Sequence, residues 1–204
     1  MGKWLVIGSE WVYRVVKANL TWLGLVILGG GIFGFFPATI ALARLVNKWL
    51  QGEKKVPIWQ VMWREYRLHF KLGAQLTIIY GGSLVVILVN LRLAFQIHHL
   101  YFMMIAYMLI FLLAIWLISL MYLFPLIANF EGSCFGYLKQ AIAIGLKDFK
   151  ILGMQIIGIF LIWLLNLEFS SLLLFGTAVI WQLYTAYCCR KVVEKITKAQ
   201  VAYQ

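Results

Sequence analysis

The sequence predicts an all-α integral membrane protein, and two observations carry this prediction: the composition and the length of the apolar runs. Of the 204 residues, 64% are hydrophobic and only 12% are charged, whereas soluble domains average about 45–50% apolar and about 25% charged residues. A water-soluble fold of this length has too little interior to bury so much apolar surface. Runs of about 20 apolar residues, long enough for a helix to cross the hydrocarbon core, complete the case.

The first element expected is an amphipathic helix over residues 1–19, lying in the membrane interface. Lys3, Glu10, Arg14 and Lys17 interrupt any apolar window of spanning length. On a helix these four side chains fall within an arc of roughly 60°, opposite apolar residues and tryptophans that suit the headgroup layer. The same charges argue against a cleaved signal peptide.

A single transmembrane domain is expected over residues 20–188, because five long runs there lack a central charge. The predicted spans cover residues 20–43, 73–91, 102–128, 151–167 and 170–188. Cytoplasmic loops are expected over residues 44–72 and 129–150, and a basic cytoplasmic tail over residues 189–204.

The orientation follows from the distribution of positive charge. All Lys and Arg residues except Lys3, Arg14, Lys17 and Arg92 fall in the two loops and the tail. The positive-inside rule therefore places these segments in the cytoplasm. Five spans then put the N-terminal helix on the outer face despite its charges. The alternative is that the glycine-rich first span is re-entrant, so that both of its flanks are cytoplasmic.

A short pattern occurs twice and suggests a duplicated helical hairpin. Phe36-Pro37 closes the first span and Phe70-Lys71-Leu72-Gly73-Ala74-Gln75 opens the second. In the same way Phe124-Pro125 closes the third span and Phe149-Lys150-Ile151-Leu152-Gly153-Met154-Gln155 opens the fourth. Parallel repeats of this kind occur in transporters. Lysine snorkelling beside a Phe-rich entry to the membrane would also produce the pattern without common descent.

The loop over residues 44–72 alternates aromatic and basic side chains. Its candidate contact residues are Trp59, Trp63, Arg64, Tyr66 and Arg67. One interpretation is anchoring on anionic lipids, at about 1 kcal/mol per basic residue near the surface. The other is a docking surface for a protein partner, in which Trp, Tyr and Arg are typical hot-spot residues. Membrane proximity explains this composition without nucleic acid as a partner.

No catalytic or metal-binding pattern is found, so neither a cofactor nor enzymatic activity is expected. The three histidines lack accompanying ligands, and no serine or cysteine has the neighbours that nucleophilic catalysis needs. If the membrane domain holds a polar pocket, we expect it near Gly34, Pro37 and Thr39, because Pro37 breaks or kinks the first span and frees a carbonyl.

Three stretches carry a resemblance to a known family. Asn19-Leu20-Thr21-Trp22-Leu23, Gly34-Phe35-Phe36-Pro37-Ala38-Thr39-Ile40-Ala41-Leu42 and Phe70-Lys71-Leu72-Gly73 resemble the YesL-like family of bacterial membrane proteins of unknown function. The resemblance implies an accessory membrane component, often encoded beside carbohydrate ABC-transport genes in Gram-positive bacteria. It implies no catalytic or ligand residues.

The expected function is therefore that of a non-enzymatic accessory protein of the bacterial cell membrane. Its cytoplasmic loops would bind the permease or ATPase of a carbohydrate ABC importer. The alternative is a small homo-oligomeric transporter or channel built from the two hairpins.

Overall fold

The structure is a computed structural model that describes residues 2–53, 56–97, 99–168 and 175–201. Within this part of the chain all regular structure is helical: α1 (Gly2–Leu28), α2 (Ile32–Leu50), α3 (Ile58–Gln96), α4 (Leu100–Asn129), α5 (Cys134–Lys147), α6 (Phe149–Glu168) and α8 (Thr177–Val201). Four described helical segments are long and apolar enough to cross a membrane: Gly8–Leu28, Ile58–Gln96, Leu100–Asn129 and Lys150–Glu168. The prediction of an all-α membrane protein is confirmed.

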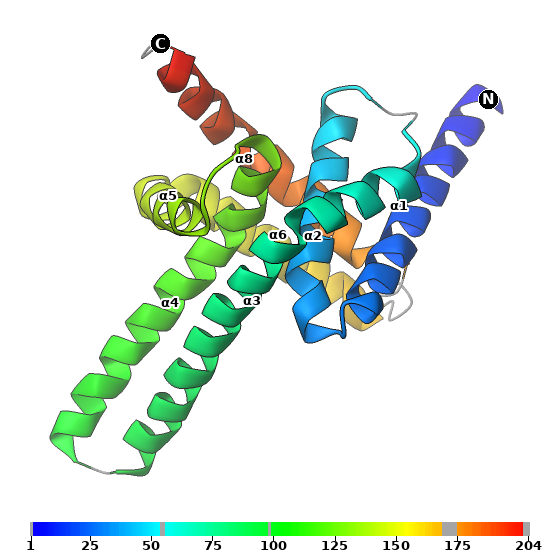
Figure 1. Ribbon diagram of the computed structural model, residues 1–204. Coiled ribbons are helices and arrows are strands. Elements are labelled where there is room, and N and C mark those ends of the chain that lie inside the picture. Colours follow the sequence, from blue (N-terminus) through cyan, green and yellow to red (C-terminus); the bar gives the residue numbers. More distant parts are fainter. Residues whose placement is uncertain (1, 54–55, 98, 169–174, 202–204) are drawn as a thin grey trace.

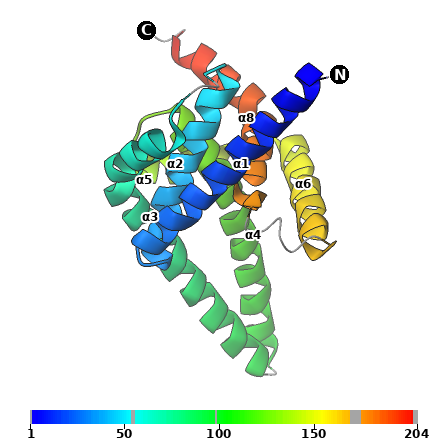
Figure 2. The same cartoon turned by 90° about the vertical axis from the view of Figure 1, so that its right-hand side faces the viewer.

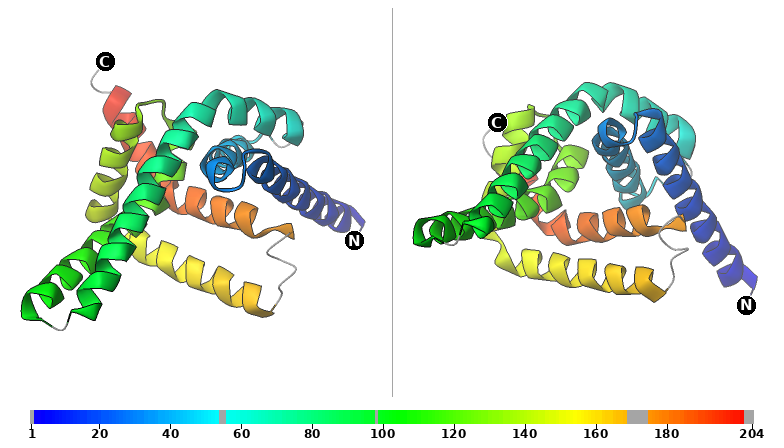
Figure 3. Two further views of the ribbon diagram at one scale, coloured as in Figure 1. Left: turned by 60° about the horizontal axis from the view of Figure 1, so that its bottom comes forward. Right: turned by 90° about the horizontal axis from the view of Figure 1, so that it is seen from below.

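The long helices pair as three hairpins, α1 with α2, α3 with α4, and α6 with α8 (Figure 1). The α1–α2 and α3–α4 turns and the facing ends of α6 and α8 all lie toward the lower side in Figures 1 and 2. Both termini and the α2–α3 connection lie toward the upper side. The view from below in Figure 3 shows α6 alongside α8. The start of α1 and the end of α8 are therefore at the same end of the molecule.

The prediction of one continuous span over residues 20–43 is wrong, because the chain reverses within it. Gly30 and Gly31 have φ angles of 76° and 75°, a left-handed conformation that glycine adopts without steric cost. The helix α1 ends at Leu28 and α2 begins at Ile32. The segment expected as a separate interfacial helix, residues 1–19, is continuous with the rest of α1. Of the two arrangements considered for this region, the reversal matches the re-entrant one.

Two close contacts hold α2 against its neighbours. Gly34 lies against the backbone of α1, where a Cβ would meet the carbonyl oxygen of Val26. Pro37 does not break the helix, since α2 continues through it to Leu50. Its ring packs on Gly73 of α3, where an added Cβ would lie 2.6 Å from the proline Cδ. The helix break therefore lies at Gly29-Gly30-Gly31, whereas Pro37 serves as a packing surface.

Two side-chain hydrogen bonds join α3 to α4 within their hairpin. Tyr80 Oη and Ser119 Oγ are 2.6 Å apart, and Trp116 donates to Ser83 Oγ over 3.0 Å. Beyond these bonds most side chains of both helices are exposed and apolar, and the hairpin extends past the other two (Figure 2). The predicted spans 73–91 and 102–128 lie within these two helices.

The predicted loop over residues 129–150 contains the helix α5. Ser133 caps it by accepting a hydrogen bond from the Gly136 amide over 3.2 Å, as N-cap serines commonly do. Tyr137 donates to the carbonyl of Phe130 over 2.8 Å. Burial raises the pKa of the Cys134 thiol, which keeps it protonated and unreactive near neutral pH.

A hydrogen bond between α1 and α8 holds the start of the last helix in place. Asn19 Oδ1 accepts a hydrogen bond from the amide of Ala178 in the first turn of α8, over 3.2 Å. Thr177 donates to Asn166 Oδ1 over 2.7 Å, which ties α8 to α6. The start of the fifth predicted span, residues 170–174, lies outside the described residues. From Thr177 the span continues without interruption into the predicted tail, because α8 extends to Val201.

The two halves of the repeated pattern meet in the core but pack differently. The rings of Phe36 and Phe124 have centroids 5.8 Å apart. Gly73 lies against Pro37, whereas a Cβ added to its counterpart Gly153 would meet no atom within 4 Å. The duplicated hairpin thus stays a prediction, since the second half does not reproduce the tight helix contact of the first.

Candidate functional site

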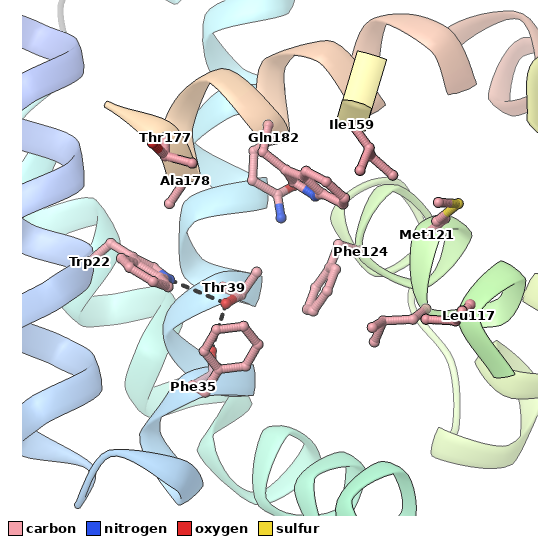
Figure 4. A pocket seen from close by; sticks show the side chains of 12 residues that line it. Trp22, Phe35, Thr39, Leu117, Met121, Phe124, Ile159, Thr177, Ala178 and Gln182 are labelled. Carbon is pink, nitrogen blue, oxygen red and sulfur yellow. Dashed lines mark hydrogen bonds between the residues drawn. The ribbon is translucent and has the colours of Figure 1, made fainter. Parts of the chain in front are cut away.

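A cavity of about 520 Å³ lies where α1, α2, α4, α6 and α8 converge. This volume is within the range of about 300–1,000 Å³ that is typical of small-molecule pockets. Of the three residues predicted to mark a polar pocket, Thr39 lines this cavity, whereas Gly34 and Pro37 are not among its lining residues. Figure 4 shows side chains from these helices surrounding the space.

The hydroxyl of Thr39 is held in place by two hydrogen bonds. It accepts from Trp22 Nε1 over 3.2 Å and donates to the carbonyl of Phe35 over 2.6 Å (Figure 4). Trp22 comes from α1 and reaches Thr39 because the glycine turn brings α1 back along α2. The helix reversal thus assembles this wall of the cavity.

The amide of Gln182 provides a second polar group. The side chain is only 2% exposed, and its Nε2 has no hydrogen-bond partner among the described residues. In Figure 4 this nitrogen points into the cavity, toward the side where Thr39 lies. Gln182 was not predicted as part of this cavity.

The rest of the lining is mostly apolar; Thr177, which also lines the cavity, donates its hydroxyl to Asn166 Oδ1. Leu117, Met121 and Phe124 come from α4, and Ile159 from α6. Among the described residues, those around this cavity include no Asp, Glu, Lys or Arg. Phe35 and Leu117 are 41% and 48% exposed, so the cavity reaches the outer apolar surface beside them.

A second candidate site is the aromatic surface at the start of α3, formed by Trp59, Trp63, Arg64 and Arg67. The rings of Trp59 and Trp63 stack with centroids 5.8 Å apart and planes 9° apart. The guanidinium carbon of Arg67 lies 4.6 Å from the centroid of Trp63, which is cation–π distance. Trp59 is 49% exposed, and both arginines are exposed.

The prediction that Tyr66 belongs to this surface is wrong. It is 6% exposed and packs in the core, and its hydroxyl lies where a Cβ on Gly29 would be. Its ring continues the stack behind Trp63, with centroids 6.1 Å apart. Tyr66 therefore anchors the aromatic surface from within.

An ion pair that the sequence did not indicate lies behind the aromatic surface. Glu65 Oε2 is 3.7 Å from Arg44 Nε of α2 and 3.6 Å from His69 Nδ1. The side chains of Glu65 and Arg44 are 12% and 18% exposed. His69 Nδ1 also lies 3.0 Å from the Glu65 carbonyl. The cluster fixes the first turns of α3 against α2.

Side chains that could bind a metal are scattered among the described residues. Nowhere in this part of the chain do three His, Cys, Asp or Glu residues come together as a metal site would need. Cys189 is buried and accepts a hydrogen bond from Gln155 Nε2 over 3.1 Å, so it packs between α6 and α8.

Comparison with known proteins gives the family setting. Residues 15–91 match the family described as "Protein of unknown function, DUF624". The resemblance to the YesL-like family is confirmed. The matched residues run from α1 into α3, so they include Thr39 and the aromatic surface but not Gln182.

Three relatives from Bacillus subtilis (strain 168) are each named as uncharacterized proteins. The chain is 36% identical to YteU over 134 residues, which cover 64% of this chain and 58% of YteU. It is 29% identical to YesV over 155 residues, or 76% and 74% of the two chains. It is 24% identical to YesL over 123 residues, or 59% and 56%. The matches thus span less than two thirds of YteU and YesL. No solved structure matches the chain.

Proposed function

We propose that the protein is a non-enzymatic accessory protein of the bacterial cell membrane that binds the permease or ATPase of a carbohydrate ABC importer. The observation that carries the proposal is the stack of the exposed Trp59 on the half-buried Trp63, with Arg67 over the Trp63 ring. Tyr66 and the Glu65–Arg44 pair hold this stack from behind, so its side chains lose little further freedom on binding. The importer as partner rests on the resemblance alone.

The proposed surface faces the cytoplasm, together with both termini. All Lys and Arg residues except Arg92 precede residue 18, lie between residues 44 and 71, or follow residue 138. These segments lie in the upper part of the molecule in Figure 1, whereas Arg92 is near the α3–α4 turn. Three hairpins entering from the cytoplasm satisfy the positive-inside rule for the N-terminal helix as well. This arrangement resolves the misfit of a basic N-terminus on the outer face.

An epitope tag on the N-terminus is expected to be protected from protease added outside intact cells. A tag inserted into the α3–α4 turn is the matched control and is expected to be cleaved. Each tagged form must also be cleaved after the membrane is permeabilised. External cleavage of the N-terminal tag would contradict the proposed topology.

Charge reversal on the aromatic surface tests the docking function. The double variant Arg64→Glu/Arg67→Glu is expected to lower co-isolation of importer permease and ATPase subunits at least tenfold, because interface arginines often carry more than 2 kcal/mol. Membrane association is expected to persist, since the apolar helices provide it. The measurement is quantitative mass spectrometry of the tagged protein isolated from bacterial membranes in mild detergent.

Lys139→Glu/Lys147→Glu on α5 is the matched control, since it makes the same change of net charge at exposed positions. We expect it to retain the importer subunits. An equal loss of importer subunits in both double variants would show that the effect comes from net charge alone. A homogeneous homo-oligomer without importer subunits, able to conduct solute after reconstitution, would instead support a small transporter.

A further inference from the structure

The buried amide of Gln182 calls for a hydrogen-bond acceptor that the described residues do not supply. Nε2 carries two N–H donors, and the side chain is 2% exposed with no partner for this atom. An unsatisfied buried donor is costly, so native structures rarely keep one without a ligand, water or ion to accept from it. Because Nε2 points into a cavity of about 520 Å³ (Figure 4), the acceptor belongs to whatever fills that space.

The remaining lining limits the chemistry of this occupant. The neighbouring hydroxyl of Thr39 already donates to Phe35 and accepts from Trp22. The other walls come mostly from apolar side chains such as Leu117, Phe124 and Ile159. A phosphate or a carboxylate would find no charged partner here, and a free sugar would leave most of its hydroxyls unpaired. The lining instead suits a molecule that is mostly hydrocarbon with one neutral oxygen.

The rim indicates where such a molecule comes from. Phe35 and Leu117 stand beside the cavity and are exposed. Leu117 belongs to Leu100–Asn129, one of the helices able to cross a membrane. An occupant can therefore enter sideways from the hydrocarbon of the bilayer without passing through water.

We propose that this cavity binds a neutral long-chain lipid, with one carbonyl or hydroxyl oxygen of the lipid accepting a hydrogen bond from Gln182. The hydrocarbon chain lies along the apolar side chains of α4 and α6. The inference is independent of the docking function, since Trp59 and Trp63 take no part in the cavity.

Photolabelling of the purified full-length protein tests the proposal. The probe is a monoacylglycerol with a diazirine at the end of its chain, and the reference is an alkane of equal length with a diazirine and no oxygen. We expect the monoacylglycerol to label peptides of α2, α4, α6 or α8, at about a tenfold lower concentration than the alkane. This factor corresponds to one net hydrogen bond.

Gln182→Leu is the decisive variant, because leucine keeps much of the side-chain volume and removes the donor. We expect labelling by the monoacylglycerol to fall about tenfold, to the level of the alkane. The variant is expected to fold, since it replaces an unpartnered buried amide with an apolar group. Gln182→Met is a second variant that removes the donor, should leucine fit poorly.

Gln155→Leu is the matched control. Gln155 is also a buried glutamine, but its Nε2 donates to Cys189 and it does not line the cavity. Labelling of this variant is expected to equal that of the wild type. The proposal is overturned if both Gln182 variants label like the wild type, if the alkane labels as well as the monoacylglycerol, or if the labelled peptides lie away from the cavity.

Discussion

Replacing Glu65 with leucine is expected to destabilise the protein by about 3 kcal/mol, because it leaves the guanidinium of Arg44 buried without its counter-charge. The carboxylate lies 3.7 Å from Arg44 Nε, and both side chains are largely buried. Removing one member of a buried pair costs more than the pair itself contributes, since the other charge then lacks both water and partner. The expected measurement is a lower midpoint of thermal unfolding in detergent.

Two variants separate this mechanism from a general effect of the substitution. The double variant Arg44→Met/Glu65→Leu removes both charges and is expected to recover most of the lost stability, as apolar replacement of whole buried pairs often does. Glu53→Leu changes an exposed carboxylate between α2 and α3 and is expected to stay within about 0.5 kcal/mol of the wild type. If the double variant is as unstable as Glu65→Leu, the uncompensated charge is not the cause.

The two spans of the α3–α4 hairpin were predictable because their apolar runs are long and contain no reversal. Residues 73–91 and 102–128 both lie inside single helices. The structure of the first predicted span, residues 20–43, was not predictable. The length of an apolar run alone does not distinguish a single membrane crossing from a hairpin that enters and leaves on the same side. Gly29-Gly30-Gly31 was the signal for the reversal. Most of α2 is buried against other helices, so its apolar residues serve packing more than lipid contact.

The cavity was predictable in part. Thr39 stood out because polar residues beside a proline in an apolar run are conspicuous. Trp22 and Gln182 reach the same space from α1 and α8, and no local pattern links residues so far apart in the chain. The ion pair of Arg44 and Glu65 was missed for the same reason, since each residue alone resembles an ordinary loop charge.

Gly73→Val is expected to force α3 away from α2 and to destabilise the protein by about 1–3 kcal/mol. A Cβ at this position would lie 2.6 Å from Pro37 Cδ and 2.7 Å from the backbone nitrogen of Pro37. Neither atom is the end of a flexible side chain, so the helices themselves must separate. For a chain of this length the unfolding midpoint is expected to fall by roughly 2–12 °C.

Gly81→Val provides the matched control on the same helix, because a Cβ there would meet no atom within 4 Å. Valine is a better helix former than glycine, so this variant is expected to be as stable as the wild type or slightly more so. Equal stability of the two variants would show that Gly73 and Pro37 do not touch as described.

Pro37 is two residues from Thr39 on α2, so a displaced α2 also moves the Thr39 hydroxyl away from Trp22. Gly73→Val should therefore weaken lipid labelling of the cavity, whereas Gly81→Val should leave it intact, which links the close packing of α2 on α3 to the shape of the cavity.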